Sequence, residues 1–385
     1  MKSVVIVDAL RTPIGSPGGK LSSLSATDLG SVVIGALYKN NSLNPDFIDE
    51  VVMGQALQAG CGPLPARQSA LKAGLKHTIP GTTINSGCAS GMQAIVYAMQ
   101  QIICDNAGIM VAGGMESMSN VPCYQFDSRK GDIQNGIRLD GLQDAFSKKP
   151  MGHSAELCAQ TYNITRQEQD DHAIASCHRS QQAKDEGAFH TEITPVKVRS
   201  HGQAEIIDSD EAPDSIEYEQ IPKQKPLYQK DGSVTTANSF KNGDGAAALL
   251  LMNEEKAQEL GLSPMARLLC QTSIAQAPKW FTTAPARAVA RVLELAGLSV
   301  SDMDLFEIHE SYSSSTLANM KLLDLDPARV NVHGGAIGLG HPLGCSGARI
   351  LTTLLHALKR HDKKRGCAAI AHGSGGALAM VVQRY

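Results

Sequence analysis

The chain has 385 residues, of which 42% are hydrophobic, and it carries a formal net charge of −3 at pH 7. This length exceeds one ordinary hydrophobic core, so we expect two domains with a further inserted subdomain. The small net charge gives no whole-chain attraction for nucleic acid or an anionic membrane surface. No apolar run of about 18 residues appears, and the chain opens in a strand-like segment, so we expect no membrane insertion and no signal peptide.

Nine cysteines are scattered through the chain, and no two of them form a CxxC pair. An odd number of cysteines spread over a long chain is not a disulfide framework, and their spacing offers no zinc or redox motif. We therefore expect reduced thiols, no metal site and a cytoplasmic protein. The cysteines stand at positions 61, 88, 104, 123, 158, 177, 270, 345 and 367.

Strand-like and helix-like segments alternate in the first third of the chain. Apolar runs bounded by turns predict strands over Ser3–Ala9, Ile48–Met53 and Gly108–Glu116. Between them, Ser25 begins one helical pattern and Arg67–Ala73 forms a shorter one. Alternation of this kind predicts an α/β architecture with a largely parallel sheet.

A turn of small residues at 84–91 carries Cys88 into an apolar helical pattern that runs to residue 104. Its hydrophobic residues recur at helical spacing, which predicts a helix with a wide buried face. A cysteine at a helix start lies near unpaired N–H groups, whose partial positive charge favours the nucleophilic thiolate. A buried structural cysteine is the alternative, because cysteine also packs as a small hydrophobe.

The stretch from about residue 117 to residue 240 differs from the preceding segments in composition and pattern. It contains long polar loops and two helical patterns, at 155–162 and 167–186, and it ends where Gly243–Ala246 leads into an apolar strand. We interpret it as an insertion over the sheet. Insertions of this size often form a lid or a binding surface.

The second half of the chain repeats the order of predicted elements in the first half. The segments around Cys88 and Gly108 reappear 257 and 258 residues later, around Cys345 and Gly366. Several matched elements in one register indicate duplicated halves rather than a chance alignment of βα units.

Three histidine-containing turns in the second half follow predicted strands or glycine-rich segments. His309 ends a strand equivalent to the one that closes at Gln55, His341 stands in GGAIGLGHPLG, and His372 opens HGSGG. The N–H groups of the last turn are suited to stabilising an oxyanion. A cysteine, a histidine partner and exposed N–H groups are together typical of acyl transfer through a thioester.

These segments make essentially the whole chain resemble the thiolase family. The resemblance implies a five-layer αβαβα fold of two duplicated halves, with an inserted loop domain that holds coenzyme A. It places the N-terminal half at 1–117 and 241–262, the loop domain at 118–240 and the C-terminal half at 263–385. The motifs that carry it are VDALRTPIG near the start, NSGCASGMQA around Cys88, MGHSAE at 151–156, NGDGAAA at 242–248, HES at 309–311 and the highly specific GGAIGLGHPLGCSGARI at 334–350.

The implied activity is acyl transfer between acyl-CoA and coenzyme A or acetyl-CoA, either as thiolytic cleavage of 3-ketoacyl-CoA or as the reverse Claisen condensation. Coenzyme A is then a substrate, and no cofactor is bound permanently. Members of the family usually form homodimers or homotetramers. Two other functions stay open: a catalytically reduced subunit that binds acyl-CoA, and a condensing acyltransferase with a non-CoA acceptor.

By motif, Cys88 matches the nucleophile that becomes acylated, and His341 matches the base that takes its proton. His309 and His341 together match the groups that bind the thioester oxygen, although most thiolases have asparagine at the position of His309. The N–H groups of Cys88 and Gly373 match a second oxyanion site. Each step passes through a negative oxygen, which such donors stabilise by several kcal/mol.

The family's second cysteine, which moves a proton on the α-carbon of the condensing acetyl group, is missing at its usual place. An ungapped alignment of RGCAAIAHGSGGALAM puts Ala371 there. Three explanations stay open. His372 takes the role, since neutral imidazole is a competent base near pH 7; Cys345 or Cys367 takes it, although Cys367 is expected to be buried; or efficient condensation and thiolysis are lost.

The coenzyme A site matches the family less closely. Lys225 stands where the family often has arginine near the nucleotide, and lysine binds phosphate as a point charge without forked donors. The loop that packs pantetheine in many thiolases is here Ala237–Lys241, in which Phe240 and Lys241 replace small residues. Either this loop is rebuilt or coenzyme A binds differently. The residues expected at coenzyme A are Lys225, Asn238, Ser239 and Phe240.

Overall fold

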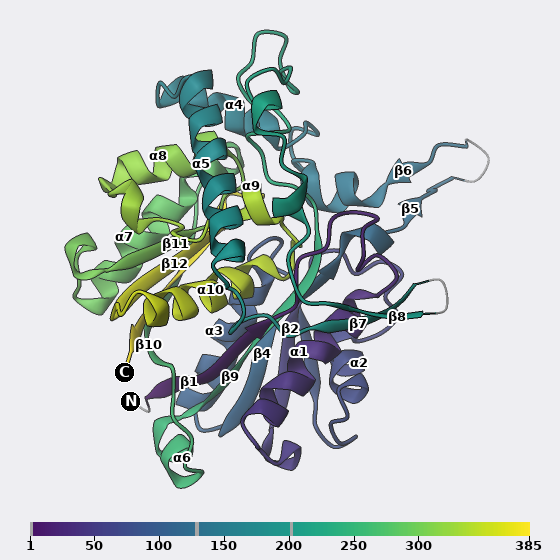
Figure 1. Ribbon diagram of the computed structural model, residues 1–385, viewed down its shortest axis with the longest axis vertical. Coiled ribbons are helices and arrows are strands. Elements are labelled where there is room, and N and C mark those ends of the chain that lie inside the picture. The colour runs from purple at the N-terminus through teal and green to yellow at the C-terminus, as the bar shows by residue number, and fades with distance from the viewer. Residues whose placement is uncertain (1–2, 128–130, 201–202) are drawn as a thin grey trace.

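The computed structural model describes residues 3–127, 131–200 and 203–385. Its centre is a nine-stranded sheet with the order β11-β12-β13-β10-β1-β9-β4-β2-β3, and two separate ribbons pair β5 with β6 and β7 with β8 (Figure 1). The strands are β1 (Val4–Arg11), β2 (Glu50–Gly54), β3 (Gly81–Ile84), β4 (Ile109–Ser117), β5 (Cys123–Tyr124), β6 (Gln134–Asn135), β7 (Val196–Ser200), β8 (Gln203–Ile207), β9 (Asp244–Asn253), β10 (Ala266–Ala275), β11 (Leu305–Ile308), β12 (Arg365–His372) and β13 (Gly376–Arg384).

Ten α-helices lie in the described ranges. They are α1 (Ala26–Asn40), α2 (Pro65–Lys72), α3 (Ser90–Ile103), α4 (Gly152–Thr161), α5 (Arg166–Asp185), α6 (Glu254–Glu259), α7 (Ala284–Ala296), α8 (Ser313–Leu323), α9 (Ala336–Leu339) and α10 (Ser346–Arg360). None of these helices is both long enough and apolar enough to cross a membrane.

The helices form three layers around the two halves of the sheet. α3 and α10 share one buried hydrophobic core with strands of both halves. α1 and α2 pack on the N-terminal half in a second core, and α7 and α8 pack on the C-terminal half in a third. Because the two half-sheets lie between these three helical layers, the expected five-layer αβαβα fold is confirmed.

The two halves share one strand arrangement, as the constant spacing in the sequence predicts. The order β2-β4-β9-β1 in the first half corresponds to β11-β12-β13-β10 in the second, and β1 pairs with β10 where the halves join. The first edge strand, β3, also has a counterpart, because Val330 forms a parallel bridge to Phe306 in β11.

The expectation of a largely parallel sheet is wrong. Among the described residues, only the pairs β2-β3, β2-β4 and β11-β12 of this sheet are parallel, and its other five neighbouring pairs are antiparallel. The reason is the connection that precedes the last strand of each half. β13 follows β12 through a short glycine turn, and β9 runs back along β4 after the insertion. A helical crossover, by contrast, joins parallel strands.

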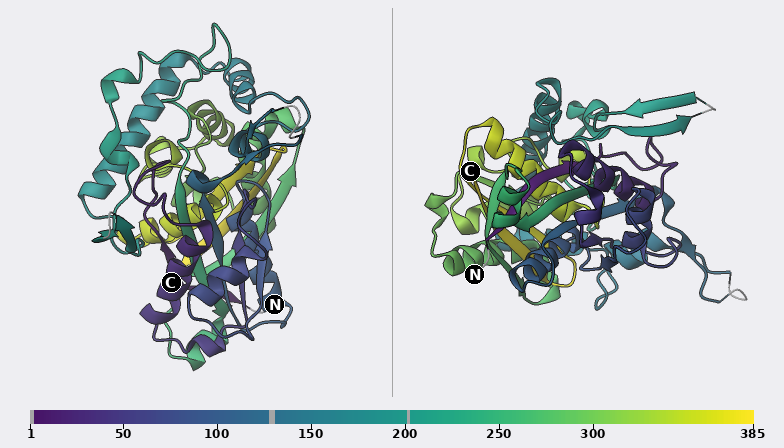
Figure 2. Two further views of the ribbon diagram at one scale, coloured as in Figure 1. Left: turned by 90° about the vertical axis from the view of Figure 1, so that its right-hand side faces the viewer. Right: turned by 90° about the horizontal axis from the view of Figure 1, so that it is seen from below.

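The predicted local elements of the first third are present within two residues of their expected bounds. α1 begins after Ser25, whose side chain and that of Asp28 form a reciprocal capping box. The insertion lies between β4 and β9, contains α4 and α5, and extends beyond one end of the sheet (Figure 2). We propose the division of the chain into an N-terminal half (1–117 and 241–262), a loop domain (118–240) and a C-terminal half (263–385).

Candidate active site

Cys88 lies in the turn between β3 and α3. The side chain of Asn85 accepts a hydrogen bond of 3.0 Å from the N–H of Gly87, which forms an Asx turn. Gly87 has a φ of +56°, a conformation that side chains with a Cβ rarely adopt. α3 then begins at Ser90. The sequence around Cys88 therefore folds locally into the predicted turn before a helix.

The starts of α3 and α10 lie against each other. A Cβ atom added at Gly91 would lie 2.9 Å from both the Gly344 carbonyl oxygen and the Ala348 amide nitrogen, so only glycine allows this approach. Leu343, in the turn before α10, packs in one hydrophobic cluster with Cys88. The equivalent turns of the two halves therefore meet at the centre of the molecule.

A cavity of about 590 Å³ opens in front of the Cys88 turn. Cys88, His372 and Gly373 all line it, together with Met151 from the insertion. The glycine turn after β12 lies close to the Cys88 turn, because a Cβ at Gly87 would be 3.4 Å from the Cβ of His372. The structure thus brings together three segments that are far apart in the sequence: the Cys88 turn, Met151 of the insertion and the glycine turn after β12.

His309 and His341 are buried side by side, with exposed fractions of 3% and 1%. Nε2 of His309 is 2.9 Å from Nδ1 of His341, and that Nδ1 is 2.5 Å from Oγ of Ser346. The hydroxyl of Ser346 donates to the carbonyl oxygen of Pro342 at 3.0 Å. With the serine proton directed to Pro342, we assign the proton of the neutral His341 ring to Nδ1, which leaves the lone pair on Nε2.

Phe240 lies edge-on against His341, with ring centres 4.9 Å apart. Within the described ranges, the lining of the cavity includes neither His309 nor His341. Leu343 joins the two regions, because it lines the cavity and stands two residues after His341. The predicted site residues therefore form two adjacent groups: Cys88 with His372 and Gly373, and His309 with His341 and Phe240.

The prediction that the helix start favours a thiolate is wrong for this turn. Loss of water around the sulfur, and then the charge of Glu116, raise the pKa of Cys88 to about 12. The residue as a whole is nevertheless partly exposed and lines the cavity. Loss of water around His341, and then the charge of Arg349, lower the pKa of His341 to about 3. At neutral pH the two residues are a thiol and a neutral imidazole.

Glu116, near the end of β4, is a fully buried carboxyl close to Cys88. Its Oε2 atom accepts hydrogen bonds of 2.9 Å from the backbone N–H groups of Ala56 and Gly344. The backbone nitrogen of Leu57 lies 3.3 Å from both carboxyl oxygens, Oε1 and Oε2. Loss of water raises the pKa of Glu116 to about 7, although these hydrogen bonds oppose the shift. The carboxyl therefore links the turn after β2 to the turn before α10.

Through Glu116, we expect the free energy of unfolding to fall by up to about 3 kcal/mol as the pH rises from 4.5 to about 7. The pKa in the folded chain is above the ordinary value, so the folded state retains a proton that the unfolded state has released. Denaturant unfolding across this range should show a shallower pH dependence in Glu116→Gln. An unchanged dependence would contradict this assignment.

A second cleft, of about 320 Å³, lies at the insertion. Part of the 237–241 loop lines it, including Lys241, and so does Gln224, the neighbour of Lys225. Lys225 itself is exposed. An anionic ligand in this cleft would therefore contact Lys241 directly and would lie near Lys225.

The side chains of Asn238 and Ser239 are occupied inside the protein. The amide of Asn238 donates to Asp170 at 2.9 Å and to the carbonyl oxygen of Ser233 at 3.0 Å. The hydroxyl of Ser239 donates to the carbonyl oxygen of Thr235 at 2.6 Å. These two buried residues therefore hold the loop in shape, and these side-chain donors are already used within the protein.

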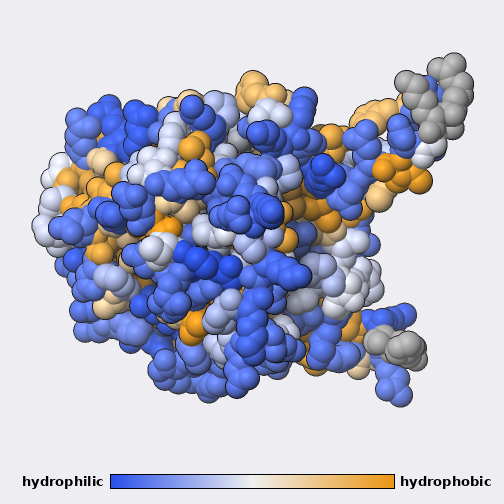
Figure 3. All heavy atoms as spheres, turned by 90° about the horizontal axis from the view of Figure 1, so that it is seen from above, coloured by the Kyte–Doolittle hydropathy of each residue, from blue (hydrophilic) through white to orange (hydrophobic). Residues whose placement is uncertain are grey.

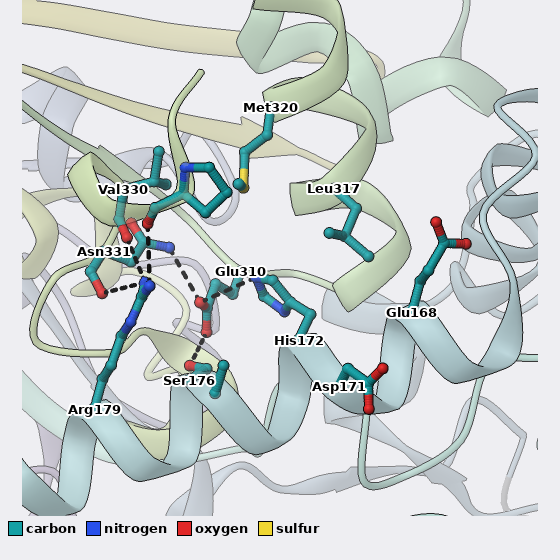
Figure 4. A pocket seen from close by; sticks show the side chains of 12 residues that line it. Glu168, Asp171, His172, Ser176, Arg179, Glu310, Leu317, Met320, Val330 and Asn331 are labelled. Atoms are coloured by element: carbon teal, nitrogen blue, oxygen red, sulfur yellow. Dashed lines mark hydrogen bonds and ion pairs between the residues drawn. The ribbon is translucent and has the colours of Figure 1, made fainter. Parts of the chain in front are cut away.

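A third cavity lies between α5 and α8 and is shown in Figure 4. At its inner end, the carboxylate of Glu310 accepts hydrogen bonds from Ser176 at 2.7 Å and from Asn331 at 3.1 Å. Asn331 also bonds the N–H and the carbonyl oxygen of Ile308, each at 2.8 Å. Glu310 of the HES motif therefore braces the backbone that carries His309.

Sequence reasoning assigned no role to Glu116 or Met151. Each stands in a segment that was already prominent: the glycine-rich end of β4 and the MGHSAE motif. The available signal for Glu116 was a charged residue in a fully buried strand. Across the described ranges, no group of three or more His, Cys, Asp or Glu residues is placed to hold a metal ion.

Comparisons with known proteins find relatives along the whole chain. Acetyl-CoA acetyltransferase of Schizosaccharomyces pombe is 44% identical to the chain, over 99% of the chain and 98% of the relative. Acetyl-CoA acetyltransferase B, mitochondrial, of Xenopus laevis is 46% identical, over 100% and 92%. The crystal structure of Bacillus anthracis acetyl-CoA acetyltransferase superposes with a TM-score of 0.97 at 38% identity, covering 100% of this chain and 99% of that one.

Two domain families account for nearly the whole chain. Residues 4–255 match the family described as thiolase, N-terminal domain, and residues 262–384 match thiolase, C-terminal domain. The boundary between the matches falls just before β10, where the second half of the sheet begins. Together with full-length relatives above 40% identity, these matches show that the chain belongs to the thiolase family.

Proposed function

We propose that this thiolase transfers an acyl group between acyl-CoA and coenzyme A or acetyl-CoA through a thioester on Cys88. The observation that carries the proposal is the cavity in which Cys88 faces His372 and the Gly373 turn. Full-length relatives named acetyl-CoA acetyltransferase support an acetyl-transferring enzyme. They do not favour the two alternatives, a catalytically reduced subunit that binds acyl-CoA and a condensing acyltransferase with a non-CoA acceptor.

His341 acts as the base in the first step. Its Nε2 keeps a lone pair because Nδ1 holds the proton that faces Ser346. Nε2 takes the proton of the Cys88 thiol as the sulfur attacks a carbonyl carbon, since the raised pKa of the thiol leaves little thiolate at rest. His309 orients the His341 ring through their contact of 2.9 Å.

In thiolysis the sulfur of Cys88 attacks the 3-keto carbon of 3-ketoacyl-CoA, and the bond between carbons 2 and 3 breaks. Acetyl-CoA leaves as an enolate and takes a proton at carbon 2. The thiol of coenzyme A then attacks the acyl group on Cys88 and releases it as acyl-CoA. The N–H groups of Cys88 and Gly373 stabilise the negative oxygen that forms in these steps.

His372 is the acid–base group that replaces the missing cysteine. It lines the cavity, and burial lowers its pKa, so its neutral imidazole is suited to take the proton from carbon 2 of acetyl-CoA in the condensation direction. In thiolysis the protonated ring returns that proton to carbon 2, and the proton balance is closed by the one that His341 takes from the Cys88 thiol. Its ring packs against Gly376, where an added Cβ would overlap Nε2. Cys345 and Cys367 are less suitable, because both are buried in hydrophobic cores.

Coenzyme A approaches through the cleft that Lys241 lines. Lys241→Ala is expected to raise the Kd for coenzyme A about tenfold, because it removes one charge-assisted contact to phosphate worth about 1.5 kcal/mol. Isothermal titration checks this, with Lys39→Ala in α1 as a control for the loss of a lysine elsewhere. Unchanged affinity in the Lys241 variant would place the nucleotide elsewhere.

The assembly that we propose is a homodimer or a homotetramer. β3 is an edge strand of the sheet, and Phe126 and Ile133 on the β5-β6 hairpin are 73% and 69% exposed. Figure 3 shows hydrophobic side chains on the arm that projects from the body. Light scattering of the purified protein determines the assembly size.

A cytoplasmic location also stays a proposal. The relatives include proteins of Xenopus laevis and Mus musculus that are named mitochondrial. Cell fractionation with an antibody against the chain decides between the two compartments.

One experiment tests the proposed function directly. The protein is incubated with acetyl-CoA, the release of coenzyme A is followed, and the acetyl adduct is mapped by mass spectrometry of its peptides. We expect one adduct, on Cys88, and its discharge on addition of coenzyme A. Absence of an adduct, or an adduct on another cysteine, would overturn the proposal.

A further inference from the structure

Phe240 packs directly on the ring of His341 and is more exposed than that ring. The two ring planes are almost perpendicular, at 89°, and their centres are 4.9 Å apart. Phe240 is partly exposed, whereas His341 is 1% exposed. At this contact the phenylalanine ring therefore occupies space that water would otherwise fill.

The backbone holds Phe240 in this place from both sides. The N–H of Phe240 donates to the carbonyl oxygen of Ser311 at 3.2 Å, which joins the loop to the HES segment. The N–H of His341 donates to the carbonyl oxygen of Lys241 at 2.7 Å, which joins the same loop to the GHP segment. The contact between the two rings is therefore fixed by the fold and does not depend on one side-chain rotamer alone.

The polar edge of the His341 ring that carries Nδ1 is already occupied within the protein. His309 and Ser346 lie 2.9 and 2.5 Å from that atom. Phe240, by contrast, offers neither a donor nor an acceptor, so it cannot replace the water that a charged imidazole needs. Attraction of a cation to an aromatic ring acts in the opposite direction, but loss of water has the larger influence on the pKa of His341.

The ionisable groups around His341 do not offset this loss of water. Arg349 on α10 repels a positive charge on the ring. His309, after β11, is kept neutral by its own burial, which lowers its pKa, and burial raises the pKa of Tyr312, so that this phenol stays uncharged. Lys241 lines the cleft and carries a positive charge. These four groups supply no negative charge that would stabilise an imidazolium.

We propose that Phe240 is a positioning residue that keeps water away from His341 and so preserves its imidazole as the base for Cys88. This inference rests on the proposed acyl transfer through Cys88. Phe240 exchanges no proton itself. It acts through His341, because only a neutral imidazole accepts the proton of the thiol.

The first test is the pH dependence of acylation in Phe240→Ser, measured by rapid quench of the acetyl adduct on Cys88. In the unmodified enzyme the rate should stay flat down to about pH 5, because the pKa of His341 is about 3. In the variant, water reaches the ring and its pKa rises toward the ordinary value of about 6.5. The base works only when it is unprotonated, so the rate should fall at least about twofold between pH 7 and pH 5.

Matched variants separate exclusion of water from loss of packing. Phe240→Leu keeps an apolar side chain over the ring, so its rate should stay flat across the same range. Phe240→Gln fills similar space with a polar group, so it should show the fall at low pH, and it replaces the serine variant if that variant does not fold. Phe47→Ser, at a position that is 49% exposed, is the control and should keep the flat profile.

A second measurement does not depend on activity. Histidine-selective NMR titration follows the imidazole of His341, whose signal is identified by its absence in His341→Ala. We expect its midpoint to rise by at least about one pH unit in Phe240→Ser and Phe240→Gln, but not in Phe240→Leu.

An unchanged midpoint in both polar variants, or the same fall of the acylation rate in Phe240→Leu as in Phe240→Ser, would overturn the role of Phe240. Absence of an adduct in the unmodified enzyme would instead overturn the proposed function, and the titration would still decide whether Phe240 keeps water from His341.

Discussion

Replacing Cys88 with serine is expected to lower the rate of thiolysis by at least about 1,000-fold and to abolish the acyl adduct. Serine keeps the shape of the turn, since Cys88 follows the Asx turn and precedes α3. Its hydroxyl, however, is much less acidic than a thiol and is a far weaker nucleophile. Steady-state thiolysis of acetoacetyl-CoA, together with intact-protein mass after incubation with acetyl-CoA, measures both effects.

Cys345→Ser is the matched control, because Cys345 holds the equivalent position in the second half. Cys345 is 1% exposed and lies in the central core, so that variant is expected to lose stability but to keep its adduct. An adduct that persists in Cys88→Ser, or that disappears in Cys345→Ser while the fold is intact, would show that the nucleophile has been assigned to the wrong half.

Replacing His341 with alanine is expected to slow acylation of Cys88 by about 100-fold to 10,000-fold, the usual contribution of a general base. With the pKa of Cys88 at about 12 and that of His341 at about 3, thiol and imidazole are both neutral over the whole range between these values. The acylation rate of the unmodified enzyme should therefore be flat from about pH 6 to about pH 9. In the variant it should rise with pH, because only thiolate formed by hydroxide reacts.

Rapid-quench measurement of the adduct at each pH tests this prediction, and His77→Ala, at an exposed position, serves as the control. A sigmoidal rise in the unmodified enzyme near pH 8 to 9, the ordinary range of a cysteine thiol, would contradict it. It would mean that the sulfur is more hydrated than its enclosed position indicates.

The fold was largely predictable because its signals are local or regularly repeated. The apolar runs that form β1, β2 and β4 are properties of a few neighbouring residues, and the second half repeats the first at a nearly constant offset. Strand direction was not predictable in the same way. It depends on which strands become neighbours, and the short turn between β12 and β13 and the return of β9 after the insertion make most pairs antiparallel.

The same distinction between local and long-range signals applies to the candidate site. The glycine turn before α3 marked Cys88, and the GHP motif marked His341, because both depend on a few adjacent residues. The roles of Glu310 and Asn238 did not show in the sequence. The side chain of Glu310 accepts a hydrogen bond from Asn331, and that of Asn238 donates one to Asp170. These partners belong to other segments of the chain, so a local motif does not reveal them.

The sequence by itself determined the duplicated halves, the turn that presents Cys88 and the family to which the chain belongs, since each rests on residue order. The protonation of Cys88 and His341 and the position of His372 at the cavity depend instead on the tertiary structure. Those properties depend on exclusion of water and on short distances, and segments from both halves and the insertion supply them together. A helix start alone favours a thiolate, but burial next to Glu116 outweighs it.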